Sequence, residues 1–120
     1  MSASVASDVR RAVDYIEANL TAPVKLEDVV RAAGMSARGL FRHFRNAMGV
    51  SPMVYLRNAR FARVRAALRG ARGGERIVDI AALWGFDHMG RFAVEYRLRF
   101  GEKPSDTRAS ARGAGKPAGR

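Results

Sequence analysis

Two arginines four residues apart, Arg38 and Arg42, are the side chains best suited to recognising a partner by its chemistry. In a helix, residues at this spacing lie on one face. A guanidinium group can donate two parallel hydrogen bonds, which match the O6 and N7 acceptors on the major-groove edge of guanine. The pair is therefore chemically able to read base edges in double-stranded DNA.

The two arginines lie in a strongly basic part of the chain. Residues 29–74 contain ten arginines and no acidic residue, and the whole chain of 120 residues carries a net charge of +11. A charge of this size indicates polyanionic partners, namely DNA, RNA or an anionic membrane surface, and does not decide the fold.

Other kinds of chemistry are poorly supported. The chain has no cysteine and only two histidines, His43 and His88, so thiolate metal sites, disulfides and thiol nucleophiles are excluded. Paired carboxylates and phosphate-binding glycine motifs are also lacking. We therefore expect no enzyme, no metal and no cofactor. No apolar run approaches the ~18 residues of a membrane helix, and the N-terminus does not resemble a signal peptide, so we expect a cytoplasmic protein without a membrane partner.

The elements that position the arginines are predicted to be short amphipathic helices. Apolar spacing, prolines and glycines predict an all-α fold of about seven helices, with no convincing strand. The expected ranges are 8–19, 26–33, 37–47, 52–69, 77–84, 88–100 and 104–109. The expected N-caps of the first, third, fourth and sixth helices are Ser7, Ser36, Ser51 and Asp87. The expected inward residues include Met48 and Val54.

Part of the chain repeats. Three residues of the first half recur 52 positions later, as Phe44 and Tyr96, Gly49 and Gly101, and Pro52 and Pro104. The glycines Gly34 and Gly85 differ by 51, so the second turn holds one extra residue. Two short helices joined by a tight, glycine-containing turn form a helix-turn-helix unit, and the repeat predicts two of them.

The pattern resembles the DNA-binding domain of the AraC/XylS family of bacterial transcription regulators over about residues 8–108. The matching residues are Leu26 to Ser36, Leu40, Arg42, Phe44, Gly49, Ser51, Pro52, Tyr55, Ile77, Asp79 to Ala81, Trp84 to Phe86, Phe92, Tyr96, Arg97, Phe100, Gly101, Pro104 and Ser105. The resemblance implies two helix-turn-helix subdomains joined by a long central helix, each entering its own major groove.

We expect a domain over residues 8–109, made of a first subdomain (8–50), a linker helix (51–70) and a second subdomain (75–109). Residues 111–120 are expected to be a disordered basic tail, because their composition cannot bury a core. The linker helix should be about 27 Å long. Together with its flanking turns it could hold the two helix-turn-helix units about 34 Å apart, which is the length of one turn of DNA.

The outer faces of the third and sixth helices define the candidate site. The expected base-reading residues are Arg38, Gly39, Arg42, Gly90, Arg91 and Val94, and the expected phosphate-binding residues are Arg45, Asn46 and Arg97. The repeat aligns Arg38 with Gly90 and Arg42 with Val94. Glycine cannot read a base edge and valine can contact only a thymine methyl group. We therefore predict that the first unit carries most of the base readout.

Three positions depart from the family pattern. Lys25 and Arg76 stand where Ser or Thr usually caps the first helix of each unit, so we expect weaker caps, by about 1 kcal/mol. Thr107 replaces an aromatic residue that usually anchors the final helix, so we expect that helix to fray. We interpret Trp84 and Phe86 as core residues.

The predicted function is sequence-specific binding to double-stranded DNA in two adjacent major grooves by a transcription regulator, in this family usually an activator. Such a regulator is either stand-alone or the C-terminal domain of a longer, effector-responsive protein. RNA polymerase is a candidate partner, and no small-molecule effector is expected for this segment alone. The alternative is a non-specific architectural protein that binds nucleic acid by charge.

Overall fold

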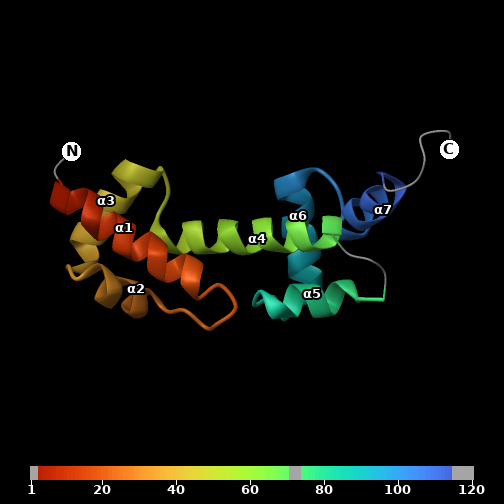
Figure 1. The fold of residues 1–120 in the computed structure, drawn as a ribbon, viewed down its shortest axis with the longest axis horizontal. Coiled ribbons are helices and arrows are strands. Elements are labelled where there is room, and N and C mark those ends of the chain that lie inside the picture. The colour runs from red at the N-terminus through yellow and green to blue at the C-terminus, as the bar shows by residue number, and fades with distance from the viewer. Residues whose placement is uncertain (1–2, 71–73, 115–120) are drawn as a thin grey trace. The chain divides into compact units, whose positions relative to one another are not determined.

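The computed structural model describes residues 3–70 and 74–114, which form seven α-helices and no strand. The prediction of an all-α fold is therefore confirmed (Figure 1). In chain order the helices are α1 (Ala3–Ala18), α2 (Leu26–Ala33), α3 (Ala37–Met48), α4 (Pro52–Gly70), α5 (Ile77–Leu83), α6 (Met89–Phe100) and α7 (Pro104–Ala114).

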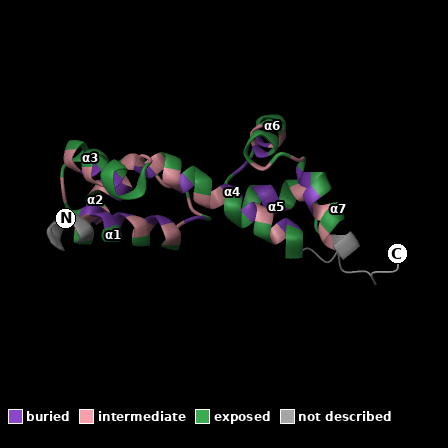
Figure 2. Cartoon of the chain, turned by 90° about the horizontal axis from the view of Figure 1, so that it is seen from above, coloured by how far each residue is buried: buried purple, intermediate pink, exposed green. Residues whose placement is uncertain are grey.

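The chain divides into two compact units, Met1–Ala59 and Arg60–Arg120, so the boundary falls within α4. In the first unit, α1 packs against α2 and α3. The apolar residues of each helix recur at intervals of three and four, which places them on one buried face (Figure 2). The buried residues of this unit are Val9, Ala12, Ile16, Leu20, Val29, Ala33, Leu40, Phe44, Pro52 and Leu56.

The core of the second unit is built from aromatic rings. Phe61 stacks on Phe92 with ring centres 5.6 Å apart, and it meets Phe86 at 4.4 Å. Phe86 is buried and Trp84 packs partly buried against the same cluster, so both are core residues as predicted. Offset rings of this kind contribute about 0.5–1.5 kcal/mol per pair beyond their burial. The cluster thereby fixes α6 on the end of α4.

Glycines with positive φ form the turn of each helix-turn-helix unit. Gly34 ends α2 at φ 75°, and Gly85 follows α5 at φ 96°. A side chain strains the backbone at such angles, which explains why glycine occupies both positions. The predicted caps at Ser36 and Ser51 are confirmed, because their hydroxyls accept from the N–H groups of Gly39 (3.1 Å) and Val54 (3.3 Å).

The ends of the chain differ from prediction. Helix α1 begins at Ala3, so Ser7 lies inside it and is not its cap. Helix α7 continues to Ala114, so residues 111–114 of the predicted tail are helical. Alanine favours the helical state, and both extensions are rich in it. Residues 115–120 of the predicted tail lie outside the described residues.

The prediction that α7 frays is wrong, because Thr107 is anchored by hydrogen bonds in place of an aromatic ring. Thr107 is only 1% exposed. The hydroxyl group of Tyr96 donates a hydrogen bond to the Thr107 oxygen at 2.7 Å, and the Thr107 O–H donates one to the carboxylate of Glu102. A buried polar group whose hydrogen bonds are made does not destabilise the core, so α7 is held.

Two residues predicted to point inward are exposed. Met48 is 39% exposed and Val54 is 44% exposed. Met48 is the last residue of α3 and Val54 lies in the first turn of α4. Fewer neighbouring elements cover a helix at its ends, so the periodic pattern overestimates burial there. Across the described ranges, every helix is too short or too polar to cross a membrane.

Candidate nucleic-acid interface

The outer face of α3 gathers the arginines that the sequence predicted. Leu40 and Phe44 are fully buried, which turns Arg38, Arg42 and Arg45 toward solvent. Arg38, Phe41, Arg42, Arg45 and Ser51 line a surface pocket of about 480 Å³. The first helix-turn-helix unit therefore presents three guanidinium groups around one hollow.

Phe41 belongs to this surface, and the sequence analysis did not include it among the candidate residues. It is 39% exposed and lies among the arginines of the pocket. An exposed aromatic ring can contact a thymine methyl group, which none of its basic neighbours can do as well. Its place one residue, or about 100°, after buried Leu40 is the signal that could have identified it.

The arginines of α3 are free to meet a polyanion. Within the described residues, Arg38, Arg42 and Arg45 form no ion pair with a carboxylate. Other arginines are paired within their own helices, among them Arg31 with Asp28 and Arg99 with Glu95. The positive charge on α3 is therefore not neutralised from within the unit.

Gly39 and Asn46 complete the predicted face of α3. Gly39 is half-buried, and a Cβ there would lie 2.8 Å from Met35 Cε and 3.2 Å from the Ser36 hydroxyl. A side chain at this position would therefore require the flexible end of Met35 to move and would press on the hydroxyl that caps α3. Asn46 is exposed one turn after Arg42.

An arginine lies over the turn in each unit. In the first, Arg11 of α1 donates to the carbonyl oxygen of Ala33, and a Cβ on Gly34 would lie 3.7 Å from its Nη2. In the second, a Cβ on Gly85 would lie 3.4 Å from Arg60 Nη1. Each turn is thus covered by a side chain from the helix that comes just before the two helices of the helix-turn-helix, α1 in the first case and α4 in the second.

The outer face of α6 is less basic than that of α3. Phe92 and Tyr96 are buried, whereas Gly90, Arg91, Val94 and Arg97 are exposed, so the four predicted residues share one face. Val94 is 63% exposed and Leu98, which the sequence analysis did not single out, is 81% exposed. This helix therefore offers solvent an apolar stripe between two arginines.

The cap of α6 is His88, and the prediction that Asp87 caps this helix is wrong. The backbone N–H of Arg91 donates to His88 Nδ1 at 3.1 Å. The second turn holds one residue more than the first, which moves the capping position by one. A ring nitrogen that accepts this bond carries no proton, so in this tautomer the imidazole N–H is on Nε2.

Neither Lys25 nor Arg76 makes a side-chain cap on α2 or α5, and the predicted weakening of these helices by about 1 kcal/mol stays a prediction. An aspartate lies three residues later in both cases. Asp28 accepts from the backbone N–H of Lys25 at 2.9 Å, and Asp79 pairs with the Arg76 guanidinium at 3.1 Å. A carboxylate in the first turn also favours the helix dipole.

Comparisons with known proteins agree with this geometry. Residues 29–110 match the family described as "Helix-turn-helix domain". The XylDLEGF operon transcriptional activator 2 of Pseudomonas putida is 43% identical over 98 residues, which cover 81% of this chain and 62% of that protein. A probable thc operon regulatory protein of Rhodococcus erythropolis is 42% identical over 82% of this chain and 30% of its own length. The chain thus spans less than two thirds of either relative.

Solved structures show the same fold. A transcriptional regulator of Chromobacterium violaceum with an AraC-type DNA-binding domain has a TM-score of 0.81 and 30% identity, covering 92% of this chain and 96% of its own. The DNA-binding domain of AdpA, solved with a target DNA, has a TM-score of 0.78 over 91% and 96% of the two chains at 23% identity, and so shares the fold. The chain belongs to the AraC/XylS family of transcription regulators and carries its helix-turn-helix DNA-binding domain.

Proposed function

We propose that this chain binds double-stranded DNA sequence-specifically, as the DNA-reading part of a transcription activator. The observation that carries the proposal is the outer face of α3, where Arg38, Arg42 and Arg45 surround the exposed ring of Phe41. The names of the Pseudomonas relatives support activation, and RNA polymerase is the partner that activation implies.

Helix α3 carries most of the base readout in this proposal. Arg38 and Arg42 each donate a fork of hydrogen bonds to guanine, and Phe41 contacts a thymine methyl group. Gly39 lets the helix backbone approach the base edges. Arg45 and Asn46 hold backbone phosphates, which position the helix without specifying a sequence.

Helix α6 has a supporting role. Arg91 and Val94 contact base edges, Gly90 permits close approach, and Arg97 binds a phosphate. Only Val94 adds apolar readout, since an alkyl side chain discriminates only the thymine methyl group. Each unit presents one such helix, and we propose that the two helices occupy adjacent major grooves.

The net charge of +11 favours a second candidate, a charge-driven architectural protein that binds any nucleic acid. A competition experiment distinguishes the sequence-specific regulator from the architectural protein. DNA sequences are first selected from a random pool with the full chain, and binding to the selected site is then measured against excess random duplex. We expect the selected site to be preferred by about 10³-fold or more. A pool without an enriched sequence, or equal competition by random duplex, supports the architectural protein instead.

A further inference from the structure

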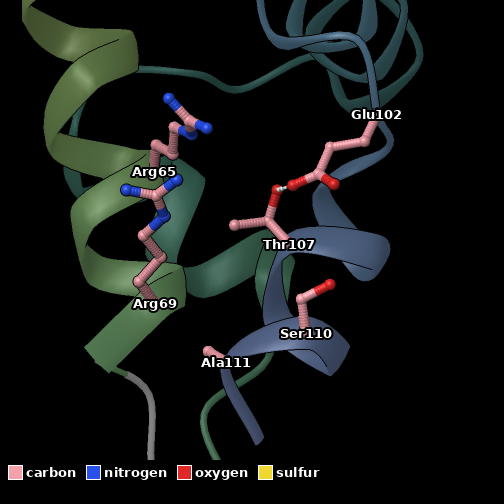
Figure 3. A pocket seen from close by; sticks show the side chains of 6 residues that line it. All are labelled: Arg65, Arg69, Glu102, Thr107, Ser110 and Ala111. Carbon is pink, nitrogen blue, oxygen red and sulfur yellow. Dashed lines mark hydrogen bonds between the residues drawn. The ribbon is translucent and has the colours of Figure 1, made fainter. Parts of the chain in front are cut away.

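A pocket lies between α4 and α7 in the second unit, on residues that the proposed DNA interface does not use. It has a volume of about 520 Å³ and is lined by Arg65, Arg69, Glu102, Thr107, Ser110 and Ala111 (Figure 3). Small-molecule sites have volumes of about 300–1,000 Å³, so the pocket is large enough for a small ligand.

One wall of the pocket consists of two arginines on one face of α4. The guanidinium carbon of Arg65 lies 4.7 Å from the centre of the Phe100 ring, which holds the group in place. Arg65 Nε is buried and makes no hydrogen bond. Within the described residues, neither Arg65 nor Arg69 pairs with a carboxylate. Two cations one helical turn apart repel each other, and an anion that contacts both relieves the repulsion.

The facing wall supplies hydroxyl groups and one carboxylate that is already engaged. Thr107 donates to Glu102 and accepts from Tyr96, so its hydroxyl proton is committed (Figure 3). Ser110, one turn further along α7, is exposed; its hydroxyl points away from the arginines in Figure 3, and rotation about its Cα–Cβ bond would let it donate to a ligand. Two arginines against one glutamate leave the pocket with a net charge of +1, which suits an anionic guest.

We propose that this pocket binds a free small molecule through one oxyanion group, a carboxylate or a phosphate. The Arg65 and Arg69 guanidinium groups donate to its oxygens, because charge-assisted bonds of this kind are the strong ones, and the Ser110 hydroxyl adds a third donor. No small-molecule effector was expected for this segment alone, and binding of such a ligand would overturn that expectation.

The position of the pocket in its unit distinguishes a free ligand from a DNA phosphate. The hydroxyl of Tyr96 reaches Thr107 in the wall, and Tyr96 is a fully buried residue of α6. Val94 lies on the opposite, solvent-facing side of the same helix and is 63% exposed. A guest between α4 and α7 is therefore on the side of α6 away from the proposed DNA interface.

The test is a titration of the full chain with inorganic phosphate, followed by ¹H–¹⁵N NMR at constant ionic strength. We expect saturable shifts of the Thr107, Ser110 and Ala111 amides. Arg69→Gln should weaken binding by about tenfold, equivalent to about 1.4 kcal/mol. Arg65→Lys keeps the positive charge but loses the two parallel N–H donors of the guanidinium group, so it should also weaken binding. The matched control is Arg63→Gln, which removes an arginine of the same helix outside the pocket and should bind as the wild type does.

Three results would overturn the proposal. They are shifts that do not saturate or that chloride reproduces, an Arg69→Gln variant that binds like the control, and displacement of phosphate from the wild-type pocket by random-sequence duplex. The last result would mean that the DNA backbone is the natural occupant. Continued phosphate binding in the presence of duplex supports a free ligand. Because DNA binding by the Arg69→Gln variant is measured separately, failure here leaves the proposed function standing.

Discussion

Arg11 donates two hydrogen bonds to the carbonyl oxygen of Ala33, from Nε at 3.2 Å and from Nη2 at 2.8 Å. This carbonyl lies at the end of α2, where the last helical carbonyls have no partner within the helix. The same guanidinium pairs with Asp8 one turn earlier on α1. The contact ties α1 to the turn that sets the angle between α2 and α3.

Replacing Arg11 should therefore destabilise the first unit. We expect Arg11→Met to lower the free energy of unfolding by about 1–2 kcal/mol, at the low end for hydrogen bonds from charged groups because the Arg11 side chain is 50% exposed. Arg10→Met is the control, because Arg10 is an exposed neighbour on the same helix, and it should change stability by less than about 0.5 kcal/mol. Urea denaturation measures the free energy of unfolding of both variants. Equal effects of the two substitutions would show that the Ala33 contact is not stabilising.

The cap of α6 gives a prediction about the second unit. His88→Ala removes the acceptor of the Arg91 N–H and should cost about 1 kcal/mol, whereas His88→Asn keeps an acceptor and should recover most of the loss. Asp87→Ala should be nearly neutral. Thermal unfolding of the three variants distinguishes the two candidate caps. If Asp87→Ala loses as much stability as His88→Ala, Asp87 also caps α6, as the sequence predicted.

The buried hydroxyl of Tyr96 predicts how stability changes at alkaline pH. Burial raises the pKa of Tyr96 above its ordinary value. With the folded pKa above the unfolded one, the contribution of this residue to stability is complete below about pH 10 and is lost as pH rises further. Below pH 10 the wild type should be more stable than Tyr96→Phe, because the variant lacks the buried hydrogen bond to Thr107. This advantage in the free energy of unfolding, measured from pH 8 to 11, should shrink as pH rises. A constant or growing difference would contradict the expected shift.

Arg45 and Arg97 are predicted to bind phosphates and not bases. Replacing either by glutamine should weaken the selected site and random duplex by similar factors. Each replacement should also flatten the slope of log affinity against log salt concentration by about one unit. Arg10→Gln, on α1, should leave the slope unchanged. If either replacement reduces the preference for the selected site, that residue reads bases.

The repeated glycine, aromatic and proline positions were sufficient to predict the fold, because they mark turns and buried faces that short helices share. The N-cap of α6 and the anchor of α7 were harder to predict. One extra residue in the second turn moved the cap from Asp87 to His88. At Thr107, hydrogen bonds to Tyr96 and Glu102 replaced the expected ring, and no local pattern encodes that exchange.

Predictions of the candidate site were more complete on α3 than elsewhere. A helical wheel placed Arg38, Arg42 and Arg45 on one face because they share one helix, and it left out Phe41, which flanks the buried side of that helix. The pocket between α4 and α7 could not be predicted in this way. Its walls come from residues about 40 positions apart, and only the packed structure brings Arg69 and Ser110 to one cavity.

The claim that α3 carries most of the base readout is tested most directly by comparing Arg42→Ala with Val94→Ala. Binding of both variants is measured on every single-base change of the selected site. Arg42→Ala should remove about 1–3 kcal/mol of discrimination at one guanine, whereas Val94→Ala should reduce discrimination only slightly, at a thymine. A loss of sequence preference in Val94→Ala equal to or greater than that in Arg42→Ala would contradict the claim.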